Sequence, residues 1–261
     1  MAEEIGVLIL HGVGIQKKGY SKSLEAGVNK LLENNGYKKE QIKYQEILYA
    51  DIFDDQSEKR GKYLINTSAW WQVVTRSIRR LLIYVLSDAV SYRARYKRVH
   101  NRISENISEL QNKMPNSTPV IVVAHSMGAI AISDYIYDLQ NPKRGDIPLI
   151  EIKNLKSIIT FGCNIPLFEM GHEKTVSISR PESDANEKDF FWTNFYSPFD
   201  VLGYRIERYY TEKPDFPIKD IKVFAGGVFT KWNLISHIGY WTHNEVHKVI
   251  SKAIEKHIHI S

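Results

Sequence analysis

Residues 120–129 read Val-Ile-Val-Val-Ala-His-Ser-Met-Gly-Ala, and this stretch decides the fold class. The apolar run before the serine is typical of a buried strand, and the residues after it are typical of a helix. Ser126 lies between the two, with small residues, Ala124 and Gly128, two positions before and after it. This is the strand–turn–helix setting of a nucleophile elbow, Gly-x-Ser-x-Gly, with alanine in place of the first glycine.

The chemistry of an activated serine explains this spacing. The serine must lie on a strained turn so that its hydroxyl stands clear of the backbone, and the flanking positions crowd together there. The following helix points its N-terminus at the reacting centre, where negative charge develops. We therefore predict Ser126 as a nucleophile and the N–H of Met127 as one donor of an oxyanion hole.

A second donor is expected close to the N-terminus of the chain. The apolar run 5–10 is typical of a parallel strand buried on both faces, and it ends in His-Gly-Val-Gly. Glycines there let the backbone approach a ligand, so we predict the N–H of Val13 as the second donor. His11, Gly12 and His125 flank these groups and are expected to contact the substrate. A plain glycine turn between a strand and a helix is the alternative.

An acidic residue follows a later strand. Residues 189–196 are predicted to form this strand, and the turn after it contains Asp200. Open α/β sheets place their catalytic groups just past the C-terminal ends of strands. Asp200 is therefore predicted to be the orienting acid, although aspartate after proline and phenylalanine is also a common turn residue.

The histidine that completes the set is expected after the last strand, predicted at 219–225. His237 lies in the segment between this strand and a C-terminal helix over 243–256. The chain order Ser, Asp, His is that of α/β-hydrolases and differs from the trypsin-like and subtilisin-like orders. His243 is the rival general base, whereas His247 is expected on a helix face.

Three segments carry a resemblance to a known family. They are the elbow Ala124–Gly128, the Phe-Gly-Cys-Asn-Ile-Pro-Leu segment at 161–167, and the Ser-His-Ile-Gly-Tyr-Trp segment at 236–241. In these segments the chain resembles the α/β-hydrolase superfamily, and within it bacterial lipase/esterase-like serine hydrolases. The resemblance implies Ser126 as nucleophile, Asp200 as orienting acid and His237 as general base. It implies a reaction type far better than a substrate.

The order of predicted elements indicates one α/β domain over 1–261. Alternating strands and helices favour a mostly parallel central sheet with helices on both faces and a helical insertion. The remaining predicted elements are strands at 43–49, 119–124 and 155–161, and helices at about 20–34, 57–111 and 127–140. A chain of 261 residues, 43% hydrophobic, is long enough for one well-covered sheet.

The composition also bears on the compartment and on cofactors. The start Met-Ala-Glu-Glu lacks a basic n-region, and the single cysteine, Cys163, cannot form an internal disulfide. Both features favour a cytoplasmic protein. Cys163 is expected to be a packed residue rather than a nucleophile. Neither a cofactor nor a metal is predicted, because no metal-ligand spacing occurs and His257 and His259 are isolated at the terminus.

Residues 57–111 are longer than one crossover helix needs. Trp70 and Trp71 precede an apolar stretch that arginines interrupt, so this stretch is too polar to span a membrane. The basic stretch from Arg93 to Arg102 follows and accounts for much of the net charge of +5. Three interpretations remain open: a packed amphipathic helix with a solvated basic face, a lid with the tryptophans at the substrate pocket, or a membrane-surface element. No motif indicates nucleic-acid binding.

The function predicted from these features is hydrolysis of a carboxylic or lipid acyl ester through a Ser-His-Asp triad and an acyl-enzyme. A small-molecule or lipid ester is therefore the expected substrate, and the oligomeric state stays open. Two alternatives remain: a catalytically silent binding protein with the same fold, and a peripheral phospholipase or lipase.

Overall fold

The computed structural model of the chain describes residues 2–12, 16–53, 73–142, 148–170, 177–181, 189–210, 214–226 and 234–259; for 73–91, 234 and 235 it describes the backbone alone. These residues form a six-stranded sheet in the order β2-β1-β3-β4-β5-β6, and all neighbouring strands are parallel. The strands are β1 (Ile5–Leu10), β2 (Ile42–Ile47), β3 (Val120–His125), β4 (Leu155–Phe161), β5 (Phe191–Tyr196) and β6 (Ile218–Lys222). The parallel sheet predicted from the sequence is thus confirmed.

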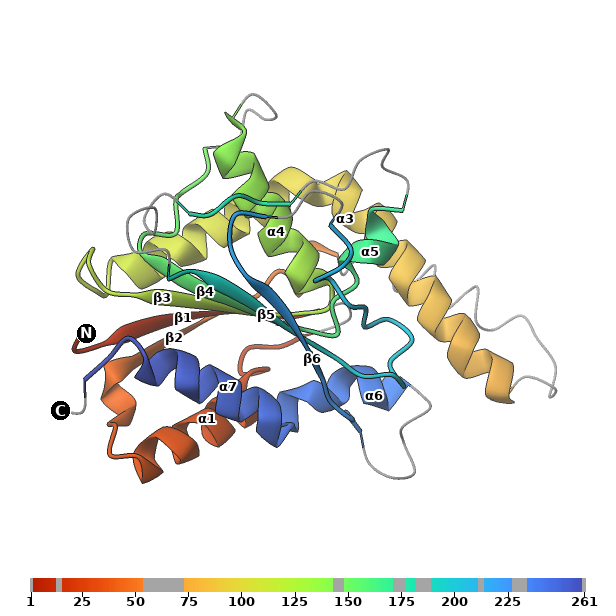
Figure 1. Ribbon diagram of the computed structural model, residues 1–261. Coiled ribbons are helices and arrows are strands. Elements are labelled where there is room, and N and C mark those ends of the chain that lie inside the picture. The colour runs from red at the N-terminus through yellow and green to blue at the C-terminus, as the bar shows by residue number, and fades with distance from the viewer. Residues whose placement is uncertain are drawn as a thin grey trace.

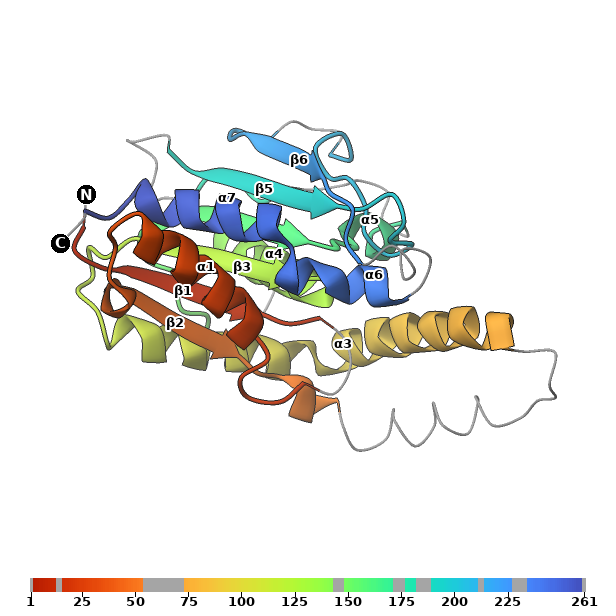
Figure 2. The ribbon, with the colours of Figure 1, turned by 90° about the horizontal axis from the view of Figure 1, so that it is seen from below.

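Helices cover both faces of this sheet (Figures 1 and 2). The helices are α1 (Lys22–Asn34), α3 (Val73–Gln111), α4 (Met127–Gln140), α5 (Ile165–Phe168), α6 (Leu234–Ile238) and α7 (Asn244–Glu255). The helices α1 and α7 lie together on one face, whereas α3 and α4 lie on the other. Short 3-10 turns occur at Lys39–Gln41, Ala50–Ile52 and Gly239–Thr242.

The side chains of the central strands alternate between two hydrophobic cores. On β1, Leu8 and Leu10 pack toward α3 and α4, whereas Val7 and Ile9 pack toward α1 and α7. All residues of β1, β3 and β4 are buried, as expected for parallel strands covered on both faces. The edge strand β6 is only partly covered, which explains its polar sequence.

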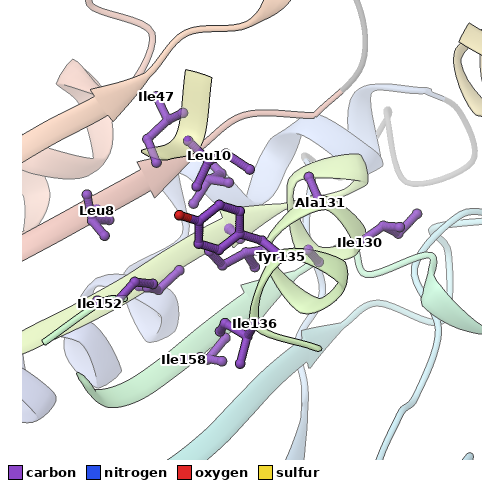
Figure 3. Packing of buried hydrophobic residues seen from close by; sticks show 14 of the residues in the cluster. Leu8, Leu10, Ile47, Ile130, Ala131, Tyr135, Ile136, Ile152 and Ile158 are labelled. Carbon is purple, nitrogen blue, oxygen red and sulfur yellow. The ribbon is translucent and has the colours of Figure 1, made fainter. Parts of the chain in front are cut away.

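Tyr135 of α4 lies at the centre of the core on the α3–α4 side (Figure 3). Its ring is surrounded by aliphatic side chains that include Leu8, Leu10 and Ile158. Its hydroxyl is buried, but it donates to the carbonyl of Ile150 at 2.7 Å and accepts from the N–H of the same residue at 2.9 Å. A buried polar group with both partners in place costs little, so this tyrosine ties the segment before β4 to the core.

The long helix α3 changes character along its length. Its backbone leaves helical geometry at Arg95 (φ −117°, ψ 16°). After this point its apolar side chains, such as Val99 and Ile103, are buried against the sheet, whereas Lys97 and Arg98 are exposed. The N-terminal part projects beyond the sheet (Figure 1). The described side chains of α3, from residue 92 onward, thus pack an apolar face against the sheet and leave basic side chains such as Lys97 and Arg98 exposed. The interpretations of residues 57–111 as a lid or as a membrane-surface element stay predictions.

The sequence did not predict two short helices. The helix α5 has four residues, and α6 has five. Helices of this length are too short to show a hydrophobic period in the sequence, so no sequence pattern predicts them. His237 consequently lies on the short helix α6 and not in an irregular loop. Within the described part of the chain, no helix is both long and apolar enough to cross a bilayer.

Candidate active site

The backbone at Ser126 adopts the strained turn that its sequence context predicts. Ser126 has a positive φ of 54° with ψ −121°, and it connects the end of β3 directly to the first residue of α4. The Ser126 N–H donates to the carbonyl of Phe161 on β4 at 3.1 Å, which fixes the turn to the neighbouring strand. A Cβ at Gly128 would lie 2.7 Å from the carbonyl oxygen of His11, so this position must be glycine.

His237 joins two side chains that are far apart in the sequence. Its Nε2 lies 2.8 Å from the Ser126 Oγ, and its Nδ1 lies 3.0 and 2.9 Å from the two oxygens of Asp200. All three side chains are buried. The sequence predicted this set in this connectivity, and the structure brings the three side chains together at the C-terminal edge of the sheet.

The two other candidate histidines are occupied elsewhere. His243 caps α7, where its Nδ1 accepts from the N–H of Glu245 at 3.2 Å. His247 lies within α7, and its Nε2 hydrogen-bonds to the carbonyl of Trp241 at 2.9 Å. Among the described histidines, therefore, it is His237 rather than the rival His243 that contacts both Ser126 and Asp200.

Three groups hold the Asp200 carboxylate. Besides His237, it accepts hydrogen bonds from the N–H of Leu202 at 3.0 Å and from the hydroxyl of Tyr240 at 2.9 Å. Burial by itself raises the pKa of Asp200, but the hydrogen bonds and the charge of His237 outweigh it and lower the pKa below its usual value. The carboxyl group is therefore ionised at neutral pH, although it is buried.

Tyr240 belongs to this network, although sequence reasoning gave its side chain no role. Its hydroxyl donates to Asp200 and accepts from the N–H of Ser197 at 2.8 Å, so both of its hydrogen-bonding directions are fixed. Burial and the neighbouring carboxylate raise the pKa of Tyr240 strongly, which keeps the hydroxyl protonated as a donor. The available signal was its place in the segment 236–241, three residues after His237.

The loop after β1 lies directly against the serine. A Cβ at Gly12 would lie 2.8 Å from the Ser126 Cβ, so the Gly12 backbone borders the site. Val13, the predicted second oxyanion donor, lies outside the described residues. Met127 is the first residue of α4, and its N–H belongs to the first turn, whose donors have no acceptor within the helix.

Two predicted substrate contacts, His11 and His125, have other partners. The His11 ring is buried; its Nδ1 bonds to the carbonyl of Gly12 at 2.6 Å, and its Nε2 accepts from the N–H of Tyr49 at 3.2 Å. Burial lowers the pKa of His11 to about 4. His125 is also buried, and its Nε2 bonds to the carbonyl of His237 at 2.8 Å. These ring nitrogens are engaged within the protein, and contact of either ring with a substrate stays a prediction.

Two further expectations from the sequence concern the tryptophans and the single cysteine. Trp70 and Trp71 lie outside the described residues, so the lid interpretation stays a prediction. Cys163 is buried beside the site, and burial raises the pKa of its thiol to about 12, as expected for a packed residue. In the part of the chain that the structure describes, no three His, Cys, Asp or Glu side chains are grouped to hold a metal ion.

The sheet order, with the serine turn directly after β3, is that of the α/β-hydrolase fold. No protein-family model and no curated protein matches the sequence.

Among solved structures, the chain is similar to a dienelactone hydrolase from Anabaena variabilis, with 12% identity, coverage of 98% of this chain and 88% of that one, and a TM-score of 0.42. It is also similar to the esterase domain of a Rhodothermus marinus protein, with 10% identity, coverage of 98% of this chain and 87% of that one, and a TM-score of 0.43. A third similar structure is Est1E from Butyrivibrio proteoclasticus, with 9% identity, the same coverages of 98% and 87%, and a TM-score of 0.41. At such identities and scores, these likenesses assign neither a reaction nor a substrate to this chain.

Proposed function

We propose that this protein is a serine hydrolase that cleaves carboxylic esters. The observation that carries the proposal is the hydrogen-bonded chain from Ser126 through His237 to Asp200, built on a turn that strains the serine backbone. A serine hydroxyl is a weak nucleophile unless an adjacent base takes its proton. His237 is that base in this proposal, because its Nε2 lies within hydrogen-bond distance of the Ser126 Oγ.

The reaction proceeds in two acyl-transfer steps. Ser126 Oγ attacks the ester carbonyl carbon while its proton passes to His237 Nε2. The tetrahedral intermediate then collapses, the C–O bond to the alcohol breaks, and His237 returns the proton to the departing alcohol. Water attacks the resulting acyl-enzyme with His237 again as base, which releases the carboxylic acid and restores the Ser126 hydroxyl.

Asp200 and the start of α4 stabilise charge in these steps. The ionised Asp200 accepts from Nδ1–H of His237, which keeps Nε2 available as the proton acceptor and stabilises the imidazolium that forms. The Met127 N–H, together with the N–H of Val13, is proposed to hold the oxyanion. Each such donor contributes about 10²–10³ in rate.

Exposed apolar side chains favour an ester with an apolar part. Met170, Val201, Phe224 and Ile238 are more than half exposed, and they lie after β4, β5 and β6. The C-terminal ends of parallel strands share one edge, so these residues lie on the side of the sheet where Ser126 is placed. The same residues favour the second candidate, a lipase or phospholipase that acts at a lipid surface.

The test combines covalent labelling with turnover. A fluorophosphonate probe is expected to label wild-type protein at Ser126, and p-nitrophenyl esters are expected to be hydrolysed faster as the acyl chain lengthens. Ser126→Ala should abolish labelling, and Ser126→Ala or His237→Ala should lower turnover on the ~10⁶-fold scale, with Asp200→Ala less severe. Ser133→Ala, a serine on α4 two turns beyond the elbow, is the matched control and should change neither.

The outcomes separate the candidate functions. Wild-type protein that folds but is not labelled would favour the catalytically silent binding protein. A jump in rate once a lipid ester aggregates, with binding to anionic vesicles that is lost after charge reversal at Arg93 and Arg98, would favour the peripheral lipase. Steady turnover of dispersed esters without vesicle binding would favour a hydrolase of soluble substrates.

A further inference from the structure

His125 is the residue before Ser126, and it also contacts the residue that bonds to Ser126. It is the last residue of β3, and its Nε2 hydrogen-bonds to the main-chain carbonyl of His237 at 2.8 Å. One peptide bond therefore separates His125 from the nucleophile, and one hydrogen bond separates it from the backbone of the base. Together with the hydrogen bond between His237 Nε2 and Ser126 Oγ, this contact closes a loop of bonds that runs from His125 through Ser126 and His237 and back to His125.

The ring of His125 is fixed on several sides. It stacks on Phe161 with ring centroids 5.3 Å apart and an interplanar angle of 28°, and it meets the edge of Trp241 at 5.5 Å. The His237 ring lies 4.7 Å away. A Cβ at Gly12 would be only 2.9 Å from Nδ1, so the loop after β1 closes that side. This packing leaves Nε2 directed at the carbonyl of His237.

His125 can serve as a constant hydrogen-bond donor, because its imidazole does not change its charge near neutral pH. Burial, followed by repulsion from His237, lowers the pKa of His125 to about 3. The imidazole is therefore neutral at pH 5 and above. It carries one N–H, and the carbonyl of His237 requires that proton on Nε2.

We infer that His125 is a positioning residue that sets the distance between the Ser126 hydroxyl and the His237 imidazole. The inference rests on the proposed function. His237 belongs to α6, a helix of five residues, and a helix this short has little stability of its own. It needs anchors from outside, and its backbone and Ser236 are held by the hydrogen bond from His125 and by that from the Ser236 hydroxyl to the carbonyl of Ala225 at 3.0 Å.

The expected effect of losing this anchor follows from the geometry of proton transfer. A misplacement of about 1 Å costs on the order of 10²-fold in rate. We expect His125→Phe, which keeps a flat ring but removes the donor, to lower kcat by about 10–10²-fold while KM changes little. His125→Gln, whose amide nitrogen can reach the position of Nε2, should recover most of this loss.

The chain contains a matched control in His247. This histidine is also buried, and its Nε2 also bonds to a backbone carbonyl, that of Trp241, at a similar distance of 2.9 Å. It lies on α7, however, and does not precede the nucleophile, and its ring nitrogen bonds to Trp241 rather than to His237. His247→Gln and His247→Phe therefore report the cost of altering a buried histidine without altering the Ser126–His237 distance.

The experiment measures kcat and KM from pH 6 to 9, the rate of fluorophosphonate labelling, and the downfield proton resonance of the His237 Nδ1–H bound to Asp200, for wild type and all four variants. Support would be a kcat loss in His125→Phe that is constant across the pH range, partial recovery in His125→Gln, and a shift of the resonance that the His247 variants do not show. If His125→Phe does not fold, the resonance and labelling rate of His125→Gln against His247→Gln decide the matter.

Two results would overturn the inference. One is wild-type kcat in a folded His125→Phe protein. The other is an equal loss in the His125 and His247 variants, which would mean a general role in stability. Neither resembles failure of the proposed function, in which the wild-type protein itself would not be labelled at Ser126.

Discussion

In the interior of the sheet, β1, β3 and β4 bury every residue, and most of these are apolar. At the C-terminal ends of β1, β3 and β5, by contrast, the buried groups include His11, His125, Ser126 and Asp200. Interior residues are held by packing, which tolerates change at a cost in stability. Edge residues are held in place by directed hydrogen bonds, and glycines beside them leave the space that their side chains occupy. The two regions should therefore fail differently when mutated: the interior through folding, the edge through chemistry.

The largest effect on stability is expected in the interior. Ile158 on β4 is fully buried in the core around Tyr135 (Figure 3). Ile158→Ala should lower the free energy of unfolding by about 2–5 kcal/mol, because it removes buried methyl groups and leaves a cavity. Urea unfolding measures the loss, and active-site titration gives the turnover of each folded molecule, which should stay at the wild-type value. A large fall in that turnover would contradict the division between interior and edge.

The next effect is expected at the edge, from one added methyl group. A Cβ at Gly203 would lie 2.5 Å from the Oδ2 of Asp200 and 3.0 Å from the hydroxyl oxygen of Tyr240. Gly203→Ala should therefore displace the carboxylate and lower kcat/KM by about 10²-fold, while unfolding in urea changes little.

The control for this variant is Gly6→Ala in β1. Its Cβ would press on the flexible end of Met114, 2.8 Å away, far from the site. It should cost some stability and leave kcat/KM unchanged. If the Gly203 variant keeps wild-type kcat/KM, the position of Asp200 is less critical than the geometry implies.

The smallest effect compares two buried tyrosine hydroxyls. Tyr240→Phe removes a donor to Asp200, and we expect it to lower kcat/KM by about 10-fold, because a hydrogen bond to a charged group contributes about 1.5–3 kcal/mol. Tyr135→Phe removes a hydroxyl that bonds to Ile150 in the interior, and it should cost about 1 kcal/mol of stability without lowering kcat/KM. Equal losses of kcat/KM in the two variants would contradict the claim that edge residues affect the chemistry and interior residues affect stability.

The same distinction explains what the sequence could predict. Apolar runs at 5–10 and 120–124 specify buried parallel strands, since a strand covered on both faces has few alternatives. The serine elbow was visible because its small neighbours are required sterically. Asp200 and His237 could be proposed because parallel strands bring their C-terminal ends to one edge.

Contacts across the edge could not be predicted in this way. The bonds from Tyr240 to Asp200 and from His125 to the carbonyl of His237 join residues far apart in the chain, and neither leaves a period or a spacing in the sequence. The prediction that His125 contacts the substrate rests on its place beside the serine, which the sequence shows, whereas the direction of its ring depends on how α6 packs. The helix α6 is itself too short to be recognised.

The burial of Cys163 makes the molecule suited to site-specific labelling. The chain has a single cysteine, and its thiol is inaccessible and protonated, with a pKa raised to about 12. A cysteine introduced at Val201 or Ile238, both exposed and each one residue beyond a member of the triad proposed above, would be the only reactive thiol. A maleimide fluorophore there would report the arrival of an apolar ligand at the edge of the sheet without background from the native sequence.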